Sequence, residues 1–427
     1  MKNEKQVLVP RLRFPEFREE GAWDVCNLGD ISTVVRGGSP RPIDGFITKD
    51  NSGLNWLKIG DVNKDAKYVT KTQEKVRAEA LSKTREVHPG DLILSNSMSF
   101  GRPYLMKIKS CIHDGWIAIT EIEESVEREY LYYLIFSSAS QSYFLDNAAG
   151  SGVLNLNAEI IKSLPISYPA QTEQQKIADC LSSLDALITA QAEKIDALKI
   201  HKKGLMQQLF PREGETVPRL RFPEFRDSGE WKRLPLGEIV GFMSGGTPSK
   251  DRADYWGGDI PWVSAASMHE ISIDRSDRNI TQSAVDDGAR IIPKGTLLIL
   301  VRGSMLHKRI PIGITACKVA FNQDVKALRM KSDISEEFLL HLLISNEARL
   351  LCAVSGTGIG AGKLDTNELE GFLICVPDMK GEQQRIASCL SSLDALITAH
   401  SDKLGALKIH KKGLMQQLFP PAKKVEG

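Results

Sequence analysis

Several features that mark common protein classes are missing from this sequence of 427 residues. It has no run of about 18 consecutive apolar residues and no apolar segment near its start, which favours neither a membrane span nor a secretory leader. Its seven cysteines are widely spaced and form no CxxC pair, so neither a disulfide framework nor a zinc site is predicted. We therefore expect a cytoplasmic protein with reduced cysteines and no membrane contact.

An excess of charge of one sign is also missing. Lys and Arg number 55 against 54 Asp and Glu, so the formal net charge is +1. A nucleic-acid partner would have to be held by local basic patches rather than by the field of the whole chain. Composition alone neither requires nor excludes DNA.

Catalytic motifs are missing as well. The segment 355–365 resembles a phosphate loop, but it has Thr357 where a Walker A motif needs glycine, and Leu364 where it needs a hydroxyl. No HExxH, GxSxG, zinc-deaminase or Asn-Pro-Pro-aromatic methyltransferase pattern occurs, and the eight histidines show no ligand spacing. The sequence therefore predicts no catalytic residue, no metal and no cofactor, and we expect a chain that is not an enzyme by itself.

What the sequence does contain is a long internal repeat. The segment VPRLRFPEFR at 9–18 returns letter for letter at 217–226, and CLSSLDALITA at 180–190 returns at 389–399. Between these near-identical stretches only a skeleton is shared, such as Arg-Gly-Gly-Ser-Pro in one copy against Ser-Gly-Gly-Thr-Pro in the other. Constant flanks around two divergent segments indicate that the flanks bind something common and that the divergent parts meet something different.

Each copy ends in a predicted long helix. The apolar residues follow at alternating steps of four and three, which is the spacing of a coiled-coil seam. A single stripe of this kind would favour a helix packed on its own domain, but two stripes of the same phase favour packing against each other. They run through Ile177, Leu181, Leu184, Ile188, Ile195, Leu198, Leu205 and Leu209, and through Ile386, Leu390, Leu393, Ile397, Leu404, Leu407, Leu414 and Leu418.

The divergent segments predict mixed α and β structure. Short runs rich in β-branched and aromatic residues, such as WIAITEI and TLLILV, alternate with Gly, Pro and Asn and are typical of strands. Helices are expected at 128–145 and 335–351. Each half is thus predicted to be an α+β domain that leads into one long helix.

Polar and basic residues gather at the ends of the predicted strands, at matching places in both halves. Arg, Asn, Ser and Thr side chains on such loops suit base edges and phosphates, although ordinary solvated turns have the same composition. The predicted DNA-binding residues of the first half are Arg36, Gly37, Ser39, Arg41, Asn96, Ser97, Ser99 and Arg102. Those of the second half are Ser244, Thr247, Lys250, Arg302, Ser304, Lys308 and Arg309.

Taken together, the arrangement resembles the specificity subunit of type I restriction-modification systems. The resemblance rests on two divergent domains that alternate with two near-identical helices, each opened by Glu-Gln-Gln, and on the Gly-Gly-Ser/Thr-Pro motif of each half. It covers nearly the whole chain. It implies two pseudo-symmetric α/β target recognition domains that are separated by two long antiparallel coiled-coil helices acting as a ruler. The expected parts are an arm and first recognition domain at 1–170, a central helix at 171–211, a second arm and domain at 212–378, and a C-terminal helix at 379–420.

The resemblance also implies partners. A specificity subunit recognises a bipartite sequence in double-stranded DNA, docks two modification subunits that carry S-adenosylmethionine and methylate adenine, and is joined by restriction (translocase) subunits. The repeat itself indicates two copies of one partner, because a surface present twice recruits the same protein twice. The predicted partner-binding residues are the aromatics of the repeated arm, Phe14, Phe17, Phe222 and Phe225, since aromatics beside arginines are typical of interface hot spots. Packing of these rings on the chain's own helices is the alternative.

A different class of function also fits the pattern. The chain would then be a non-DNA adaptor with two ligand-binding modules on a coiled coil. The two readings differ in salt dependence, because a protein that contacts phosphates loses affinity steeply as salt rises and a mainly apolar protein interface does not.

Overall fold

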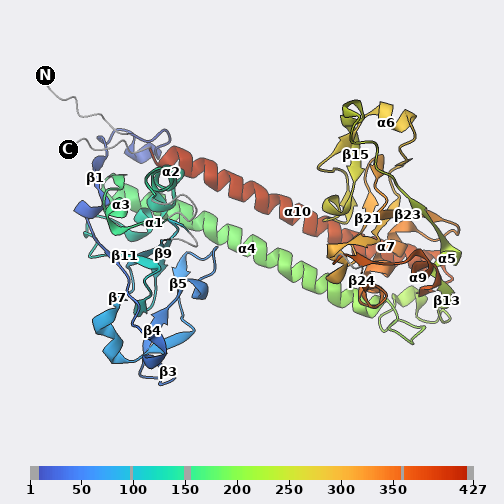
Figure 1. Cartoon of the computed structure of the whole chain (residues 1–427), viewed down its shortest axis with the longest axis horizontal. Helices are drawn as coiled ribbons and strands as arrows, with labels where there is room; N and C mark the ends of the chain where they lie inside the picture. The colour runs from blue at the N-terminus through green and yellow to red at the C-terminus, as the bar shows by residue number, and fades with distance from the viewer. Residues whose placement is uncertain (1–8, 97–99, 149–154, 357–359, 421–427) are drawn as a thin grey trace. The chain divides into compact units, whose positions relative to one another are not determined.

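The computed structural model describes residues 9–96, 100–148, 155–356 and 360–420. The chain divides into two compact units. Unit 1 combines the residues up to 192 with those from 402 onward, and unit 2 consists of residues 193–401. Each long helix therefore contributes one part to each unit. In Figure 1 the first long helix is green and the second is red.

The long helices α4 (Gln171–Leu209) and α10 (Lys380–Leu418) follow the predicted apolar spacing. Early seam positions such as Leu181 and Leu390 are fully buried in their units. Proline follows two residues after the end of each helix, where it cannot continue the backbone hydrogen bonds.

Lysines interrupt the apolar seam, and each is paired within its own unit. In unit 2, Lys202 of α4 lies 2.5 Å from Asp394 of α10, and in unit 1, Lys411 of α10 lies 2.5 Å from Asp185 of α4. Within unit 1 the N-terminal part of α4 thus packs beside the C-terminal part of α10, and within unit 2 the reverse holds. The helices are antiparallel, which confirms the predicted fold class.

Unit 1 contains two five-stranded sheets, and α4 follows them in the chain. One has the strand order β2-β11-β8-β9-β5, and a second has the order β3-β6-β4-β10-β7. The first comprises β2 (Thr33–Arg36), β11 (Trp116–Thr120), β8 (Leu92–Ser95), β9 (Pro103–Met106) and β5 (Tyr68–Val69). The second comprises β3 (Ile47–Thr48), β6 (Glu74–Val76), β4 (Leu54–Leu57), β10 (Ser110–Ile112) and β7 (Arg85–Val87).

Unit 2 repeats this topology, except that its second sheet has four strands and, among the described residues, no counterpart of β3. Its sheets have the orders β14-β23-β19-β21-β16 and β17-β15-β22-β18. The first comprises β14 (Val240–Ser244), β23 (Val325–Met330), β19 (Leu297–Leu300), β21 (Ile312–Thr315) and β16 (Ser272–Ile273). The second comprises β17 (Asn279–Ile280), β15 (Trp256–Val263), β22 (Val319–Phe321) and β18 (Ile291–Ile292).

Short antiparallel pairs join the beginning and the end of each domain. They are β1 (Asp24–Asn27) with β12 (Pro165–Tyr168), and β13 (Lys232–Pro235) with β26 (Leu373–Val376). Unit 2 also has a small sheet of β20 (Arg302–Gly303), β25 (Gly362–Lys363) and β24 (Ser355–Gly356). Short helices between the strands include α3 (Ala158–Lys162), α5 (Leu236–Ile239), α6 (Gln282–Asp286) and α9 (Thr366–Gly371).

The helices expected at 128–145 and 335–351 are each broken in two. The first consists of α1 (Arg128–Phe136) and α2 (Ser138–Asn147), because Ser137 leaves the helical conformation and its hydroxyl caps α2. The second consists of α7 (Glu336–Ser345) and α8 (Glu347–Cys352), which meet at Asn346. The residue at each break, Ser137 or Asn346, is of a type that favours the N-cap of a helix, and this is the sequence signal for the breaks.

The cores of the units are built from the first sheet, the paired helices and the long-helix ends of each unit. In unit 1, Tyr130 of α1 packs on Phe419, with ring centroids 5.5 Å apart, and in unit 2 the equivalent Phe338 packs on Phe210 at 5.7 Å. No helix among the described residues combines the length and apolar character that a membrane crossing requires.

Candidate DNA interface

The Gly-Gly-Ser-Pro motif of unit 1 lies directly against the loop between β10 and β11. The Gly37 amide donates to the Trp116 carbonyl at 2.8 Å, and the Gly38 amide donates to Ile112 at 3.2 Å. A Cβ atom on Gly37 would lie 2.3 Å from the His113 carbonyl oxygen. Gly37 therefore allows two loops to touch, which is a backbone role beside the DNA contact predicted for it.

Unit 2 builds the same contact from its Gly-Gly-Thr-Pro motif. The Gly246 amide donates to the Phe321 carbonyl at 2.9 Å, and a Cβ atom on Gly245 would lie 2.0 Å from that oxygen. The close backbone contact thus explains why both divergent halves contain the Gly-Gly motif. Its glycines pin one loop onto another, and the residue after them, Ser39 or Thr247, is held at the junction.

In unit 1 this junction is centred on Asp114, which sequence reasoning missed. Its Oδ1 accepts a hydrogen bond of 2.9 Å from the Ser39 hydroxyl and lies 3.0 Å from His113 Nε2. His113 Nδ1 accepts from the Gly115 amide at 2.9 Å, so in the neutral ring the proton is on Nε2, the nitrogen nearer to Asp114. Oδ2 of Asp114 faces the guanidinium of Arg41 at 3.6 Å.

The backbone carbonyl of Asp114 accepts hydrogen bonds from two more of the predicted residues. It accepts from Arg36 Nε at 2.9 Å and from Asn96 Nδ2 at 3.2 Å. The structure therefore brings Arg36, Ser39, Arg41 and Asn96 together around one residue. We call these residues with His113 and Asp114 the Asp114 cluster.

The carboxyl group of Asp114 is ionised at neutral pH. Partial burial on its own raises the pKa of Asp114, but the Ser39 hydrogen bond and the nearby His113, Arg36 and Arg41 outweigh this and lower it below the ordinary value. The cluster thus holds a fixed negative charge within a ring of donors.

Four members of the Asp114 cluster line a cleft of about 700 Å³: Ser39, Arg41, His113 and Asp114. The lining also includes Trp56 and the ion pair between Lys58 and Glu74, whose Nζ and Oε1 lie 2.5 Å apart. Arg41 lies at the rim with 83% of its side chain exposed. The cleft is lined by hydrogen-bond donors and acceptors and by side chains of both charges, which suits recognition of polar edges.

The remaining predicted residues of unit 1 lie elsewhere. The Arg102 guanidinium packs over the rings of Phe136 and Tyr104, with its Cζ 4.9 and 5.9 Å from the ring centroids. Ser97 and Ser99 lie outside the described residues. Arg102 is thereby engaged with α1 and β9 rather than with the Asp114 cluster.

In unit 2 the equivalent junction is centred on Gln323. Its Oε1 accepts a hydrogen bond of 2.8 Å from the Thr247 hydroxyl, just as Asp114 accepts from Ser39. The neighbouring Ser244 accepts from Lys326 Nζ at 2.5 Å. Lys250 follows on the same exposed loop. Gln323 was also missed, because nothing in the sequence near it repeats the residues near Asp114.

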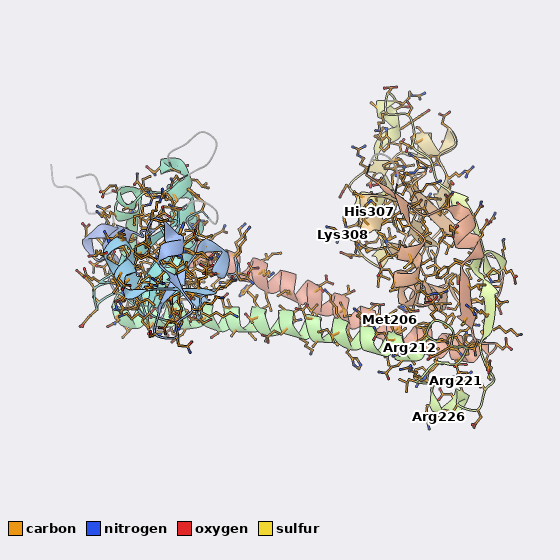
Figure 2. All side chains as sticks on the ribbon, turned by 60° about the horizontal axis from the view of Figure 1, so that its bottom comes forward. Met206, Arg212, Arg221, Arg226, His307 and Lys308 are labelled. Carbon is orange, nitrogen blue, oxygen red and sulfur yellow. The ribbon has the colours of Figure 1, made fainter. Side chains whose placement is uncertain are left out.

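The other predicted residues of unit 2 lie along a second segment. Arg302 lies in β20 and pairs in register with Lys363, and Ser304 opens the short helical turn that follows. Arg309 donates to the Met268 carbonyl at 3.0 Å. Lys308 is exposed, and Figure 2 shows it beside His307 at the edge of unit 2.

The aromatics of the repeated arm pack largely on the chain itself. Phe14 and Phe222 contact the cores of their units, and Phe225 is 9% exposed beside Gly381, while Phe17 is half-buried. A role in partner binding stays a prediction for these rings.

Each arm is fixed to a long helix by a buried arginine. Arg13 makes a two-pronged ion pair with Glu173 at 2.9 and 2.7 Å and also donates to the Glu20 carbonyl at 2.7 Å. Arg221 repeats this with Glu382 at 2.7 Å from both nitrogens. Figure 2 shows Arg221 in the arm of unit 2. Sequence reasoning missed both pairs, although each residue lies in a repeated stretch.

Some apolar side chains on the long helices face solvent. They occupy the same two positions in both copies: Leu187 is 56%, Leu396 48%, Ile200 72% and Ile409 74% exposed. The two long helices thus carry exposed apolar side chains at matching positions. No group of three or more His, Cys, Asp or Glu able to hold a metal occurs among the described residues.

Comparison with known proteins gives consistent matches. The family model for the type I restriction modification DNA specificity domain matches residues 20–199 and again 228–408. The type I restriction enzyme EcoR124I/EcoR124II specificity subunit of Escherichia coli is 32% identical over 257 residues, which cover 57% of this chain and 58% of that protein. The MjaVIII specificity subunit of Methanocaldococcus jannaschii is 22% identical over 431 residues, covering 96% and 93%.

Solved structures show the same fold. The type I restriction-modification S subunit from M. genitalium has a TM-score of 0.59 at 15% identity and covers 97% of this chain and 99% of its own. A chain from a study of complex assembly in a type I R-M system has a TM-score of 0.58 at 18% identity and covers 94% and 98%. The family expected from the sequence is confirmed.

Proposed function

Because the chain belongs to the type I restriction modification DNA specificity family, we propose that each unit reads one half of a bipartite DNA target. The observation that carries the proposal is the pinned loop present in both units, at Ser39 in one and Thr247 in the other. Its donors and acceptors belong to short loops at strand ends, the kind of element that positions side chains against base edges.

The test is the salt dependence of duplex binding by the chain in complex with its modification subunits. A DNA reader loses affinity with a slope of about -0.9 per phosphate contact in a log-log plot. Arg302→Ala should reduce this slope or the sequence preference, whereas Arg226→Ala, which removes an equally exposed arginine from the arm, should change neither. A flat salt profile would instead favour the adaptor reading.

The chain's role is recognition rather than catalysis. Methylation of adenine with S-adenosylmethionine belongs to the modification subunits, and cleavage belongs to the restriction subunits that join them. A turnover assay with the chain alone, with S-adenosylmethionine and duplex DNA, should give no methyl transfer, while addition of the modification subunit should restore it.

Two copies of the modification subunit dock on the repeated surfaces. Leu187 and Ile409 in unit 1, and Leu396 and Ile200 in unit 2, present the same apolar side chains to a partner. Native mass spectrometry of the co-expressed subunits tests this with the double variant Leu187→Glu, Ile409→Glu, which should lose one modification subunit and keep the other. Thr189→Glu places one such charge on an exposed polar position of α4 and should keep both copies. Retention of both copies by the double variant would move the docking surface elsewhere.

A further inference from the structure

The two pinned loops hold different side chains at one equivalent position. Asp114 of unit 1 and Gln323 of unit 2 both follow a strand that forms the parallel pair of the second sheet, β10 with β4 and β22 with β15. Each accepts a hydrogen bond from the hydroxyl of the Gly-Gly-Ser/Thr-Pro motif, at 2.9 and 2.8 Å. The supporting hydroxyl is therefore present in both units, whereas the side chain that it holds is a carboxylate in unit 1 and an amide in unit 2.

We infer that residues 114 and 323 are specificity-determining residues, each of which reads the edge of one base in its own half-site. The inference rests on the proposed function and deepens it. It assigns a cytosine to Asp114 and an adenine to Gln323, and it makes Ser39 and Thr247 positioning residues.

The chemistry of Asp114 selects its partner. Its Oδ1 is occupied by Ser39 and His113, whereas Oδ2 lies 3.6 Å from Arg41, beyond hydrogen-bond distance, and keeps lone pairs for an incoming donor. An ionised carboxylate is repelled by phosphates, so on a DNA-facing loop it is favourable only against an exocyclic amino group. In the major groove, Asp and Glu pair with the amino group of cytosine. The flanking Arg36 and Arg41 offset the repulsion between the carboxylate and the DNA backbone.

The chemistry of Gln323 selects a different base. Its Oε1 keeps a second lone pair beside the Thr247 hydrogen bond, and its amide nitrogen has two hydrogens to donate. An acceptor and a donor side by side match the N6 amino group and N7 of adenine. Gln323 is exposed, so both groups are accessible.

The experiment uses the complete complex of the chain with its modification subunits. A duplex library that is randomised in one half-site and fixed in the other is selected by binding and sequenced, for the native complex and for Asp114→Gln and Gln323→Asp. Each exchange should alter the preference at one position of its own half-site by about 10- to 100-fold and leave the other half-site as it was. Recognition of the untouched half-site reports that the variant is folded.

Ser39→Ala and Thr247→Ala provide the second measurement. Each removes the supporting hydroxyl, Thr247→Ala together with a methyl group, and should relax the same position as the exchange in its unit, by a smaller factor. Unchanged preferences in the exchange variants, a uniform loss of affinity at all positions, or relaxation of a different position by Ser39→Ala would each overturn the inference. If the native complex selects no bipartite sequence, the proposed function fails instead.

Discussion

The two units attach their domains to the same helix surface by different contacts. In unit 1 the face of α4 presents Ser182 and Asp185 beside Lys411, and in unit 2 the face of α10 presents Ser391 and Asp394 beside Lys202. These side chains come from the identical repeats. The domain residues that meet them do not, because Tyr133 stands in α1 where His341 stands in α7.

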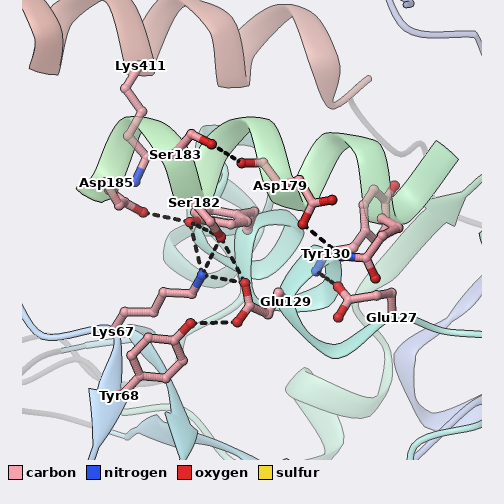
Figure 3. A network of polar contacts seen from close by, with 12 residues as sticks. Lys67, Tyr68, Glu127, Glu129, Tyr130, Asp179, Ser182, Ser183, Asp185 and Lys411 are labelled. Atoms are coloured by element: carbon pink, nitrogen blue, oxygen red, sulfur yellow. Dashed lines mark hydrogen bonds and ion pairs between the residues drawn. The ribbon is translucent and has the colours of Figure 1, made fainter. Parts of the chain in front are cut away.

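Unit 1 fills this contact with a dense polar network, shown in Figure 3. Lys67 donates to Glu129 at 2.9 Å, to Ser182 at 2.9 Å and to the Tyr133 hydroxyl at 3.1 Å. Tyr133 in turn donates to Asp185 at 2.6 Å. Hydrogen bonds from Tyr68, Lys67 and Ser182 overcome the effect of burial and lower the pKa of Glu129 below its ordinary value. The domain and the helix are thus joined by a network that keeps its charges paired.

Unit 2 has a sparser contact at the equivalent place. His341 is fully buried, its Nε2 lies 3.2 Å from the Ser391 hydroxyl and 3.9 Å from Asp394, and its Nδ1 has no hydrogen-bond partner in the described part of the chain. The comparison teaches that a constant Ser-Asp-Lys surface accepts domains of different chemistry, which a chain with divergent recognition segments requires.

The largest expected effect comes from breaking the network in unit 1. Glu129→Ala leaves the ammonium of Lys67, whose side chain is 11% exposed, without its carboxylate, and should cost about 3 to 4 kcal/mol of unfolding free energy in unit 1. The matched control is Glu337→Ala at the same position of unit 2, where the glutamate is exposed, and it should cost about 0.5 kcal/mol or less. Hydrogen exchange in each unit during urea unfolding measures both. Equal losses would mean that the network does not stabilise unit 1.

The next comparison removes the lysine of each seam. Lys202→Ala leaves Asp394 with only a distant His341, and should cost about 3 kcal/mol, because a partly buried carboxylate loses its cation. Lys411→Ala leaves Asp185 with the Tyr133 hydroxyl, and should cost about 1 to 2 kcal/mol. Chemical denaturation of the two variants gives the difference. A larger loss of unfolding free energy for Lys411→Ala would contradict the expectation that Asp185 keeps a better hydrogen-bond partner than Asp394.

The sequence predicts features that depend on neighbouring or regularly spaced residues, and it does not predict contacts between residues far apart in the chain. Strands, seam and repeats are local or periodic, so β8, β11, β19 and the long helices follow from the sequence. Of the candidate site, the loop residues Arg36, Ser39 and Asn96 could be predicted because they end buried strands. Asp114 could not, because its hydrogen bond to Ser39 joins positions 75 residues apart.

The same limit applies to the arms. The aromatics of the repeat were predicted to meet a partner, with packing on the chain itself as the alternative; Phe14 and Phe222 pack on their own units, and partner binding stays a prediction for them. What fixes the arms is the pair of Arg13 with Glu173, 160 residues apart, and a repeat in the sequence shows that both residues recur without showing that they touch.

The stability of unit 2 should depend on pH through His341, which has no counterpart in unit 1. Burial, and then the charge of Lys202, lower the pKa of His341 to about 3, against an ordinary value of 6.5. Between these values the unfolded state binds a proton that the folded state does not, so stability is full above pH 6.5 and falls as the pH decreases toward 3. At pH 5 the loss in unit 2 should reach about 2 kcal/mol, at roughly 1.4 kcal/mol per pH unit.

The control for this effect is His341→Gln. Burial raises the pKa of Asp394, which opposes the histidine at the acid end of the range, but that carboxyl group is present in both proteins. The difference between the native chain and the variant, measured by urea unfolding at pH 7 and pH 5, therefore reports His341. Parallel curves for the two proteins would contradict the burial of a neutral imidazole.

The smallest expected difference lies between the two serines of the shared surface. Ser182 donates to Glu129 at 2.8 Å and accepts from Lys67 at 2.9 Å, so Ser182→Ala removes two hydrogen bonds to charged groups and should cost about 2 kcal/mol. Ser391 meets His341 at 3.2 Å, and Ser391→Ala should cost about 1 kcal/mol. Both serines lie in identical repeats, so helix propensity changes equally in the two variants and cancels. Equal costs would show that the divergent domains, Lys67 and His341 included, add nothing to what the constant helices supply.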